Sequence, residues 1–250
     1  MKIKILLCLA TAFLFVACVP KWKITEYSST KIPLDSTTER LVNRQYINYL
    51  QTISVQMDAQ MSEIIGQSAQ TMEVSRPESL LSNFVSDLLR QAATQALLQP
   101  IDIGIMNIGG LRTQIMAGEV TVRNMYEVMP FENELVVIWL RGDTLQKVID
   151  EIAAKNGEGI SGIKMTIKNR KPFDLTIANE PLDKNRIYSI ATNDFMAGGN
   201  DELYHLAQRL KIEYTGLKIR DLLIQTFKDA TKNGTKVSSQ IDGRIKVKNE

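Results

Sequence analysis

Residues 101–112 read IDIGIMNIGGLR and contain a strand pattern followed directly by a glycine-rich loop. Apolar residues alternate through 101–106, which is the period of a β-strand. Asn107 and the pair Gly109-Gly110 end that strand, and Arg112 follows the turn. Loops after strands are where α/β proteins commonly bind ligands. Arg112 could hold a phosphate or carboxylate there, although a simple turn with a solvated arginine explains the same letters.

The sequence on both sides of this strand alternates irregularly between strand and helix patterns. Apolar runs and period-2 alternation predict further strands at 134–140, 163–167, 175–177, 187–192 and 245–248, and an extended segment at 62–72. Helical spacing of apolar residues predicts helices at 37–59, after Ser75, at 143–155 and at 217–230. This order predicts an α/β (α+β) domain, in which a mixed β-sheet is flanked by helices, rather than a doubly wound parallel sheet.

Two of the helix starts are marked by capping patterns. Ser75 is followed three residues later by Glu78, with Pro77 between them, which has the form of a capping box with proline in the first turn. Asp143 and Gln146 have the same spacing. The apolar stripe after Ser75 is expected to be buried and consists of Leu80, Leu81, Phe84, Val85, Leu88 and Leu89.

The composition excludes several kinds of functional site. The 250 residues include 30 Lys and Arg against 28 Asp and Glu, and a net charge of +2 gives no electrostatic footprint for binding DNA or RNA. One His and two Cys are too few for a zinc site built from Cys and His clusters. They also leave too few imidazoles for most two-metal hydrolase sites.

The N-terminal segment MKIKILLCLATAFLFVAC has the form of an export signal. Lys2 and Lys4 precede an apolar run of about a dozen residues, which is shorter than the ~20 residues of a membrane-spanning helix. Ala17-Cys18 resembles a bacterial lipobox, at which the cysteine is lipidated, although Phe15 stands where Leu is usual. A plain cleaved signal peptide and a buried N-terminal helix are the alternatives.

The predicted organisation follows from this segment. Residues 1–17 are expected to be a lipoprotein signal peptide, 18–36 a polar tether and 37–250 a single domain. The mature protein would be exported and lipid-anchored through Cys18 to the bacterial cell envelope, in the periplasm or on the outer surface.

Two further loops adjoin the apolar strands. The first, MPFEN at 129–133, contains Phe131, which is either an exposed stacking platform or a core residue. The second, ATNDFMAGGND at 191–201, contains Phe195, a Gly-Gly pair and Asp201. An Asp beside a glycine turn commonly accepts hydrogen bonds from ribose hydroxyls, and local Asx-type turns of Asp194 and Asp201 are the alternative.

Together, these loops resemble the C-terminal domain of the 5'-nucleotidases. That family has an N-terminal two-metal phosphoesterase domain and a C-terminal domain that grips the nucleoside. The resemblance extends over roughly 42–247, and the segments that carry it follow the order of the family: 78–87, 107–112, 118–121, 130–133 and 188–201. It implies a 5'-nucleotidase C-terminal domain-like fold over 37–250.

The resemblance implies roles for individual residues. Phe131 and Phe195 match the two aromatic residues that sandwich the base. Asp201, six residues after Phe195, matches the acceptor of the ribose hydroxyls. Asn107 and Arg112 match an Asn and an Arg that contact the ribose and the phosphate side.

Two more positions and one departure complete the comparison with the family pattern. Asn133 matches a residue that bonds the base edge, and Arg76, two residues before Glu78, matches a second Arg. The family usually has Gly-Gly-Asp-Gly-Tyr where this chain has Gly-Gly-Asn-Asp-Glu at 198–202. The spacing from Phe195 to the aspartate is kept, but the residues around the aspartate differ.

The residues of the catalytic half are missing. A two-metal phosphoesterase site needs several His and Asp ligands, and the single His205 is expected to be a helix-surface or half-buried residue. We therefore predict no catalytic residue and no cofactor on this chain, with divalent metals held by a separate metallophosphatase chain. The expected ligand is a nucleoside or nucleoside monophosphate.

Two alternatives remain open at this point. One is a non-catalytic lipoprotein that captures nucleosides or nucleotides for scavenging. The other is a structural protein that kept the fold and lost ligand binding, against which Phe131, Phe195 and Asp201 argue.

Overall fold

The computed structural model describes residues 22–32 and 43–248. The predicted signal peptide at 1–17 and the predicted lipidation site Cys18 lie outside the described residues. Of the predicted tether, 22–32 is described and has no helix or strand. The chain divides into two units, 1–51 and 52–250, and the account below concerns the second unit by itself. The helix expected at 37–59 is present as α2 (Arg44–Met61), which spans that division.

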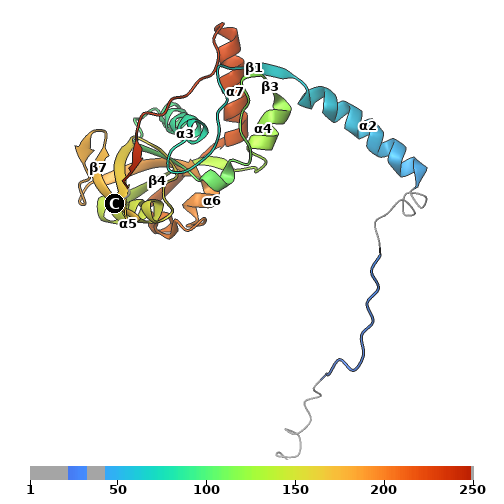
Figure 1. Ribbon diagram of the computed structural model, residues 1–250, viewed down its shortest axis with the longest axis horizontal. Coiled ribbons are helices and arrows are strands. Elements are labelled where there is room, and N and C mark those ends of the chain that lie inside the picture. Colours follow the sequence, from blue (N-terminus) through green and yellow to red (C-terminus); the bar gives the residue numbers. More distant parts are fainter. Residues whose placement is uncertain (1–21, 33–42, 249–250) are drawn as a thin grey trace, which may run out of the picture. The chain divides into compact units, whose positions relative to one another are not determined.

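A five-stranded mixed sheet forms the centre of the second unit (Figure 1). Its strands, in spatial order, are β10 (Lys211–Lys218), β4 (Glu134–Arg141), β9 (Ile187–Asn193), β2 (Ile103–Met106) and β5 (Gly159–Ser161). The pair β2–β9 is parallel, whereas β10–β4, β4–β9 and β2–β5 are antiparallel. The predicted mixed sheet flanked by helices is therefore confirmed.

Two smaller sheets complete the strand structure. One has four strands, in the order β11 (Ile245–Val247), β6 (Ile163–Lys168), β7 (Lys171–Ile177) and β8 (Glu180–Pro181). The other pairs β1 (Ile64–Ser68) with β3 (Gly118–Thr121). The strands predicted at 163–167, 175–177 and 187–192 are confirmed within these bounds, and the one predicted at 245–248 is confirmed except that it ends at Val247.

Helices cover both faces of the central sheet, and successive residues of β4 show how. Leu135 and Val137 pack into a core with α3 (Leu80–Leu97), α4 (Val122–Val128) and α7 (Ile219–Lys232). Val136 and Ile138 pack on the opposite face into a core with α5 (Gly142–Ala154). Side chains alternate across a strand, so a continuous apolar run can fill two cores at once. Figure 1 shows α5 on the other side of β4 from α3.

The glycine in β2 allows α3 to approach the sheet closely. All four residues of β2 are buried, because both faces of the strand are covered. A Cβ atom on Gly104 would lie 2.3 Å from the backbone oxygen of Ser86 in α3. Only glycine fits this contact without a backbone shift.

Both predicted helix starts are wrong, although both helices are present. The N-cap of α3 is Ser79, whose hydroxyl accepts from the backbone N–H of Ser82, and not Ser75. The Arg76–Pro77 peptide is cis and precedes the helix. Glu78 is not a capping-box partner, because its Oε1 accepts from Asn83 Nδ2 at 2.8 Å. Leu81, Val85 and Leu89 of the predicted stripe are fully buried, and Leu80, Phe84 and Leu88 are partly buried.

The start of α5 differs from the predicted N-cap at Asp143 because of contacts with a distant part of the chain. Its N-cap is Arg141, and Asp143 lies in the first turn. The backbone N–H groups of Gly142 and Asp143 donate to the carbonyls of Arg186 and Lys184, so β4 runs directly into the helix.

The edge strand β10 was not predicted, since its charged and polar residues give no clear strand pattern. Within 22–32 and 43–248, no helix is both long and apolar enough to cross a membrane.

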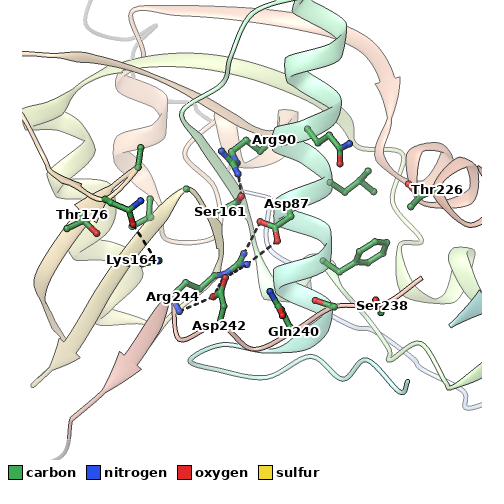
Figure 2. Close-up of a pocket in the computed structure, with 18 residues that line it drawn as sticks. Asp87, Arg90, Ser161, Lys164, Thr176, Thr226, Ser238, Gln240, Asp242 and Arg244 are labelled. Atoms are coloured by element: carbon green, nitrogen blue, oxygen red, sulfur yellow. Dashed lines mark hydrogen bonds and ion pairs between the residues drawn. The ribbon is translucent and has the colours of Figure 1, made fainter. Parts of the chain in front are cut away.

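Arg244 fastens the C-terminal segment to the body of the domain (Figure 2). Its guanidinium donates to both carboxylate oxygens of Asp87 in α3, at 2.9 and 3.0 Å, and to the carbonyl of Ile160 in β5 at 2.8 Å. It also donates twice to Asp242, at 2.9 Å each. All five donors of the guanidinium are thereby used. The hydrogen bond from Arg244 lowers the pKa of Asp242, although burial opposes this.

We expect Arg244→Gln to lower the free energy of unfolding at pH 7 by about 1–3 kcal/mol, because charge-assisted hydrogen bonds are lost. The folded pKa of Asp242 is below its unfolded value, so this stabilisation is present above about pH 5 and is lost as the pH falls through and below 4. Urea unfolding at pH 7, 5 and 3 measures it, with the exposed Arg170→Gln as control. An equal loss at pH 7 and pH 3 would contradict the ionic account.

Candidate functional site

A cavity of about 320 Å³ lies at one edge of the central sheet. Three loops meet there: the 3₁₀ turn η2 (Ile108–Gly110) after β2, the loop before β4, and α6 (Asp194–Ala197) after β9. β2 and β9 are parallel and β4 is antiparallel to β9. The C-terminal ends of β2 and β9 and the N-terminal end of β4 therefore lie at the same edge of the sheet. The residues that line the cavity are Asn107, Gly109, Gly110, Arg112, Phe131, Asn133, Phe195 and Asp201.

The structure thus brings six of the seven predicted binding residues to one cavity. Arg76 is the exception, because it is not among the lining residues. Its guanidinium pairs instead with Glu158, and its Nε donates to the carbonyl of Gly157 at 2.8 Å. Arg76 is therefore not placed to contact a ligand in the cavity directly.

The two aromatic side chains are open to solvent. Phe131 is 45% exposed and Phe195 is 47% exposed, so the alternative that Phe131 packs into the core is wrong. Among the described residues, neither ring stacks against another aromatic ring. The cavity lining therefore includes two exposed aromatic side chains that a planar ligand could cover.

A single carboxylate connects the two aromatic loops. Asp194 Oδ1 accepts from the backbone N–H of Phe195 at 2.9 Å, from Asn133 Nδ2 at 3.0 Å and from the backbone N–H of Glu134 at 3.3 Å. The bond to Phe195 is local but joins adjacent residues, so it is not the Asx-type turn that the sequence suggested, and the bonds across to the other loop were not predicted. Asp194 therefore fixes how far apart the two aromatic loops lie.

Arg220 of α7 supports the loop that carries Phe131, and no sequence pattern pointed to it. It is buried, pairs with Glu132 and donates to the carbonyl of Met129 at 3.2 Å. Its guanidinium carbon lies 3.9 Å from the centre of the Tyr126 ring. Its Nε has no hydrogen-bond partner within the part of the chain that the structure describes. A lone arginine in a helix gives no sequence signal of such a role.

The glycine loop carries one buried and one exposed polar residue. Asn107 is 5% exposed, and its Oδ1 accepts from Asn193 Nδ2 at 3.1 Å. Arg112 is exposed at the mouth of the cavity, where its Nη1 donates to the carbonyl of Gly109 at 3.2 Å. Arg112 is therefore free to turn toward a ligand that reaches the mouth.

The altered loop at 198–202 still presents its aspartate to the cavity. Gly199 has a φ of +81°, and a Cβ atom there would lie 3.0 Å from the carbonyl oxygen of Tyr204, so glycine is required. Asn200 Nδ2 donates to the carbonyl of Phe195 at 2.8 Å. Asp201 Oδ2 is buried and has no hydrogen-bond partner among the described residues. An unpaired buried carboxylate oxygen is costly, which marks it as an acceptor for a donor on a ligand.

His205 has a local partner rather than a metal environment. It lies in η3 (Tyr204–Gln208), is partly exposed, and its Nδ1 is 2.6 Å from Glu151 Oε1. This agrees with the expected half-buried position. Within 22–32 and 43–248, no group of three or more His, Cys, Asp and Glu side chains is arranged to hold a metal ion.

A larger hollow of about 710 Å³ lies elsewhere on the domain and is lined by none of the seven predicted binding residues. Figure 2 shows that it is bordered by Asp87 and Arg90 of α3, by strands of the four-stranded sheet and by the C-terminal segment. Arg244 and its two carboxylate partners occupy part of its wall. All five donors of Arg244 are used by these carboxylates and the Ile160 carbonyl, so it offers none to a ligand, and the smaller cavity is the better candidate site.

Comparison with known protein families identifies the domain. The family model "5'-nucleotidase, C-terminal domain" matches residues 59–209, which include every residue that lines the cavity. The chain belongs to the 5'-nucleotidase C-terminal domain family. The family resemblance and the fold expected from the sequence are both confirmed.

Individual relatives agree with this assignment. The trifunctional nucleotide phosphoesterase protein YfkN of Bacillus subtilis is 28% identical over 236 residues, which are 86% of this chain and 16% of the relative. Protein UshA of Escherichia coli is 29% identical over 175 residues, which are 66% of this chain and 31% of UshA. The chain therefore spans less than a third of either relative.

A solved structure shows the same fold. The 5'-nucleotidase precursor of Thermus thermophilus superposes with a TM-score of 0.71 at 25% identity, over 80% of this chain and 42% of that protein. The NAD nucleotidase of Haemophilus influenzae superposes with a TM-score of 0.63 at 20% identity.

Proposed function

We propose that this 5'-nucleotidase C-terminal domain binds a nucleoside or nucleoside monophosphate in the 320 Å³ cavity. The base would lie between Phe131 and Phe195, and the sugar hydroxyls would donate to Asp201 Oδ2. One observation carries the proposal: the residues that match the family pattern come from three separate loops and line one cavity. The names of several relatives, such as nucleotide phosphoesterase, describe proteins that act on nucleotides.

The side chains suit such a ligand physically. Stacking on an aromatic face contributes about 1–3 kcal/mol per base and tolerates different bases. The amides of Asn107 and Asn133 can bond the sugar and the base edge. Arg112 at the mouth would favour a nucleotide over a nucleoside through charge-assisted hydrogen bonds to phosphate.

We further propose that hydrolysis, where it occurs, uses a separate metallophosphatase chain. A two-metal site draws on several His and Asp ligands, and this chain has a single His, whose Nδ1 is already bonded to Glu151. The divalent metals would belong to the partner, and this chain would grip the substrate. If the chain binds nucleotides tightly without such a partner, a scavenging lipoprotein is the better description.

We also propose that the protein is exported and anchored by lipid on Cys18. The support is the sequence of residues 1–18, with two lysines, a short apolar run and Ala17-Cys18. Acyl chains on Cys18 would hold the domain at a membrane surface without a spanning helix.

Titration calorimetry with adenosine and AMP tests the binding site. We expect both ligands to bind the wild type, and Phe195→Ala to weaken binding by about 5- to 100-fold because one stacking face is lost. Phe173→Ala is the matched control, since Phe173 is 49% exposed on β7 and does not line the cavity. If the wild type binds neither ligand, with or without a candidate partner, the proposed function is wrong.

Phosphate release from AMP tests the division of labour. We expect this chain with added divalent metal to release no more phosphate than a protein-free control, because it supplies no second imidazole ligand. A metallophosphatase encoded by a neighbouring gene should form a complex with it and restore turnover. Robust turnover by this chain alone would refute the separation.

Labelling of the full chain with a radioactive fatty acid in a bacterial host tests the anchor. We expect Cys18→Ser to abolish the label and to release the protein from the membrane fraction. Cys8→Ser is the matched control and should keep both properties, because residue 8 would leave with the signal peptide. Retention of Cys18→Ser on the membrane would rule out this anchor.

A further inference from the structure

Four charged side chains form a continuous row behind the cavity. They are Arg76, Glu158, Lys155 and Asp201, with alternating charge along the row. Lys155 Nζ is 2.9 Å from Glu158 Oε1 and 3.1 Å from Asp201 Oδ1. Only Asp201 lines the cavity, so the other three residues act behind it.

Glu158 is the most buried member of the row. It is 1% exposed, and its Oε1 accepts from both Arg76 and Lys155. Its Oε2 accepts from the backbone N–H of Ile108 at 2.6 Å. Ile108 is the first residue of the glycine turn. A buried carboxylate with three donors is well satisfied, so Glu158 ties the glycine loop to the row.

Lys155 has no hydrogen left for a ligand. Its ammonium lies close to three acceptors: Glu158 Oε1, Asp201 Oδ1 and the Asp201 carbonyl oxygen, the last at 2.6 Å. An ammonium has three donors, and its side chain is only 12% exposed. Burial alone would lower the pKa of Lys155, but the bonds to Glu158 and Asp201 raise it overall. Lys155 therefore remains charged and holds Asp201 from behind.

Asp201 is held at two points and has an unpaired oxygen at a third. Its backbone has a φ of +56°, which is uncommon for a residue other than glycine, and the bond from Lys155 to its carbonyl stabilises that conformation. Its Oδ1 faces Lys155, and its Oδ2 has no partner among the described residues. A Cβ atom on Gly109 would lie 3.5 Å from Oδ2, so this oxygen borders the glycine turn.

We propose that Lys155 and Glu158 are positioning residues that orient Asp201 Oδ2 beside the glycine turn and thereby set a preference for sugars with 2' and 3' hydroxyls. This inference rests on the proposed nucleoside-binding function. Without Lys155 the Asp201 carboxylate could rotate, and Oδ2 would no longer be held in one position to accept a hydrogen bond. The row acts on sugar recognition and leaves base stacking unchanged.

The test compares the affinities of adenosine and 2',3'-dideoxyadenosine by calorimetry, using the full-length chain. We expect the wild type to prefer adenosine by about 10- to 100-fold, since a hydroxyl that donates to a carboxylate is a strong hydrogen bond. Lys155→Met should reduce that preference to a few-fold, while the affinity for the dideoxy nucleoside stays within about twofold of wild type. Asp201→Ala should abolish the preference. The exposed Lys147→Met in α5, the helix that ends just before Lys155, is the matched control and should behave as wild type.

The outcomes separate this inference from the proposed function. If the wild type binds neither nucleoside, the proposed function fails. If the wild type prefers adenosine and Lys155→Met keeps the full preference, or loses both affinities equally, the positioning role is overturned. Glu158→Gln keeps an acceptor for the Ile108 N–H while removing the negative charge. It should also reduce the preference for adenosine over the dideoxy nucleoside. This variant replaces Lys155→Met in the test if Lys155→Met does not fold.

Discussion

The strand β9 pairs in parallel with β2 and antiparallel with β4, and the site depends on this arrangement. It brings the ends of two strands and the start of a third to one edge of the sheet, together with their loops. Each loop alone is a turn with a few polar or aromatic residues, and together they line a cavity. The two apolar cores on either face of the sheet hold β9 and its neighbours in this register. Packing thus determines which loops can share a ligand.

Charged side chains, two of them buried, then hold each loop in place. Asp194 links the two aromatic loops, Arg220 supports the loop with Phe131, and Glu158 holds the glycine turn. Burying a charge costs free energy unless hydrogen bonds satisfy it, so such groups favour a defined geometry over raw stability. The two aromatic rings remain exposed, and one oxygen of Asp201 remains without a hydrogen-bond partner among the described residues. That combination suits a ligand with a flat ring and a hydroxylated sugar.

Local patterns in the sequence predicted most of the fold and most of the lining residues. The apolar runs at 134–140 and 187–192 and the glycine turn after 106 are properties of neighbouring residues, and the structure confirms the strands. The choice between Ser75 and Ser79 as N-cap could not be read this way, because both are serines and tertiary contacts decide. Lys155 and Asp201 lie 46 residues apart, so their contact exists only once the chain has folded. Supporting residues that act over such separations leave no local signature.

A structure of the chain with adenosine bound tests the central claim most directly. The account predicts that the adenine ring lies between Phe131 and Phe195, and that a sugar hydroxyl lies within hydrogen-bond distance of Asp201 Oδ2. Adenosine bound instead in the polar hollow beside Arg90 and Arg244, or with its sugar turned away from Asp201, would contradict it.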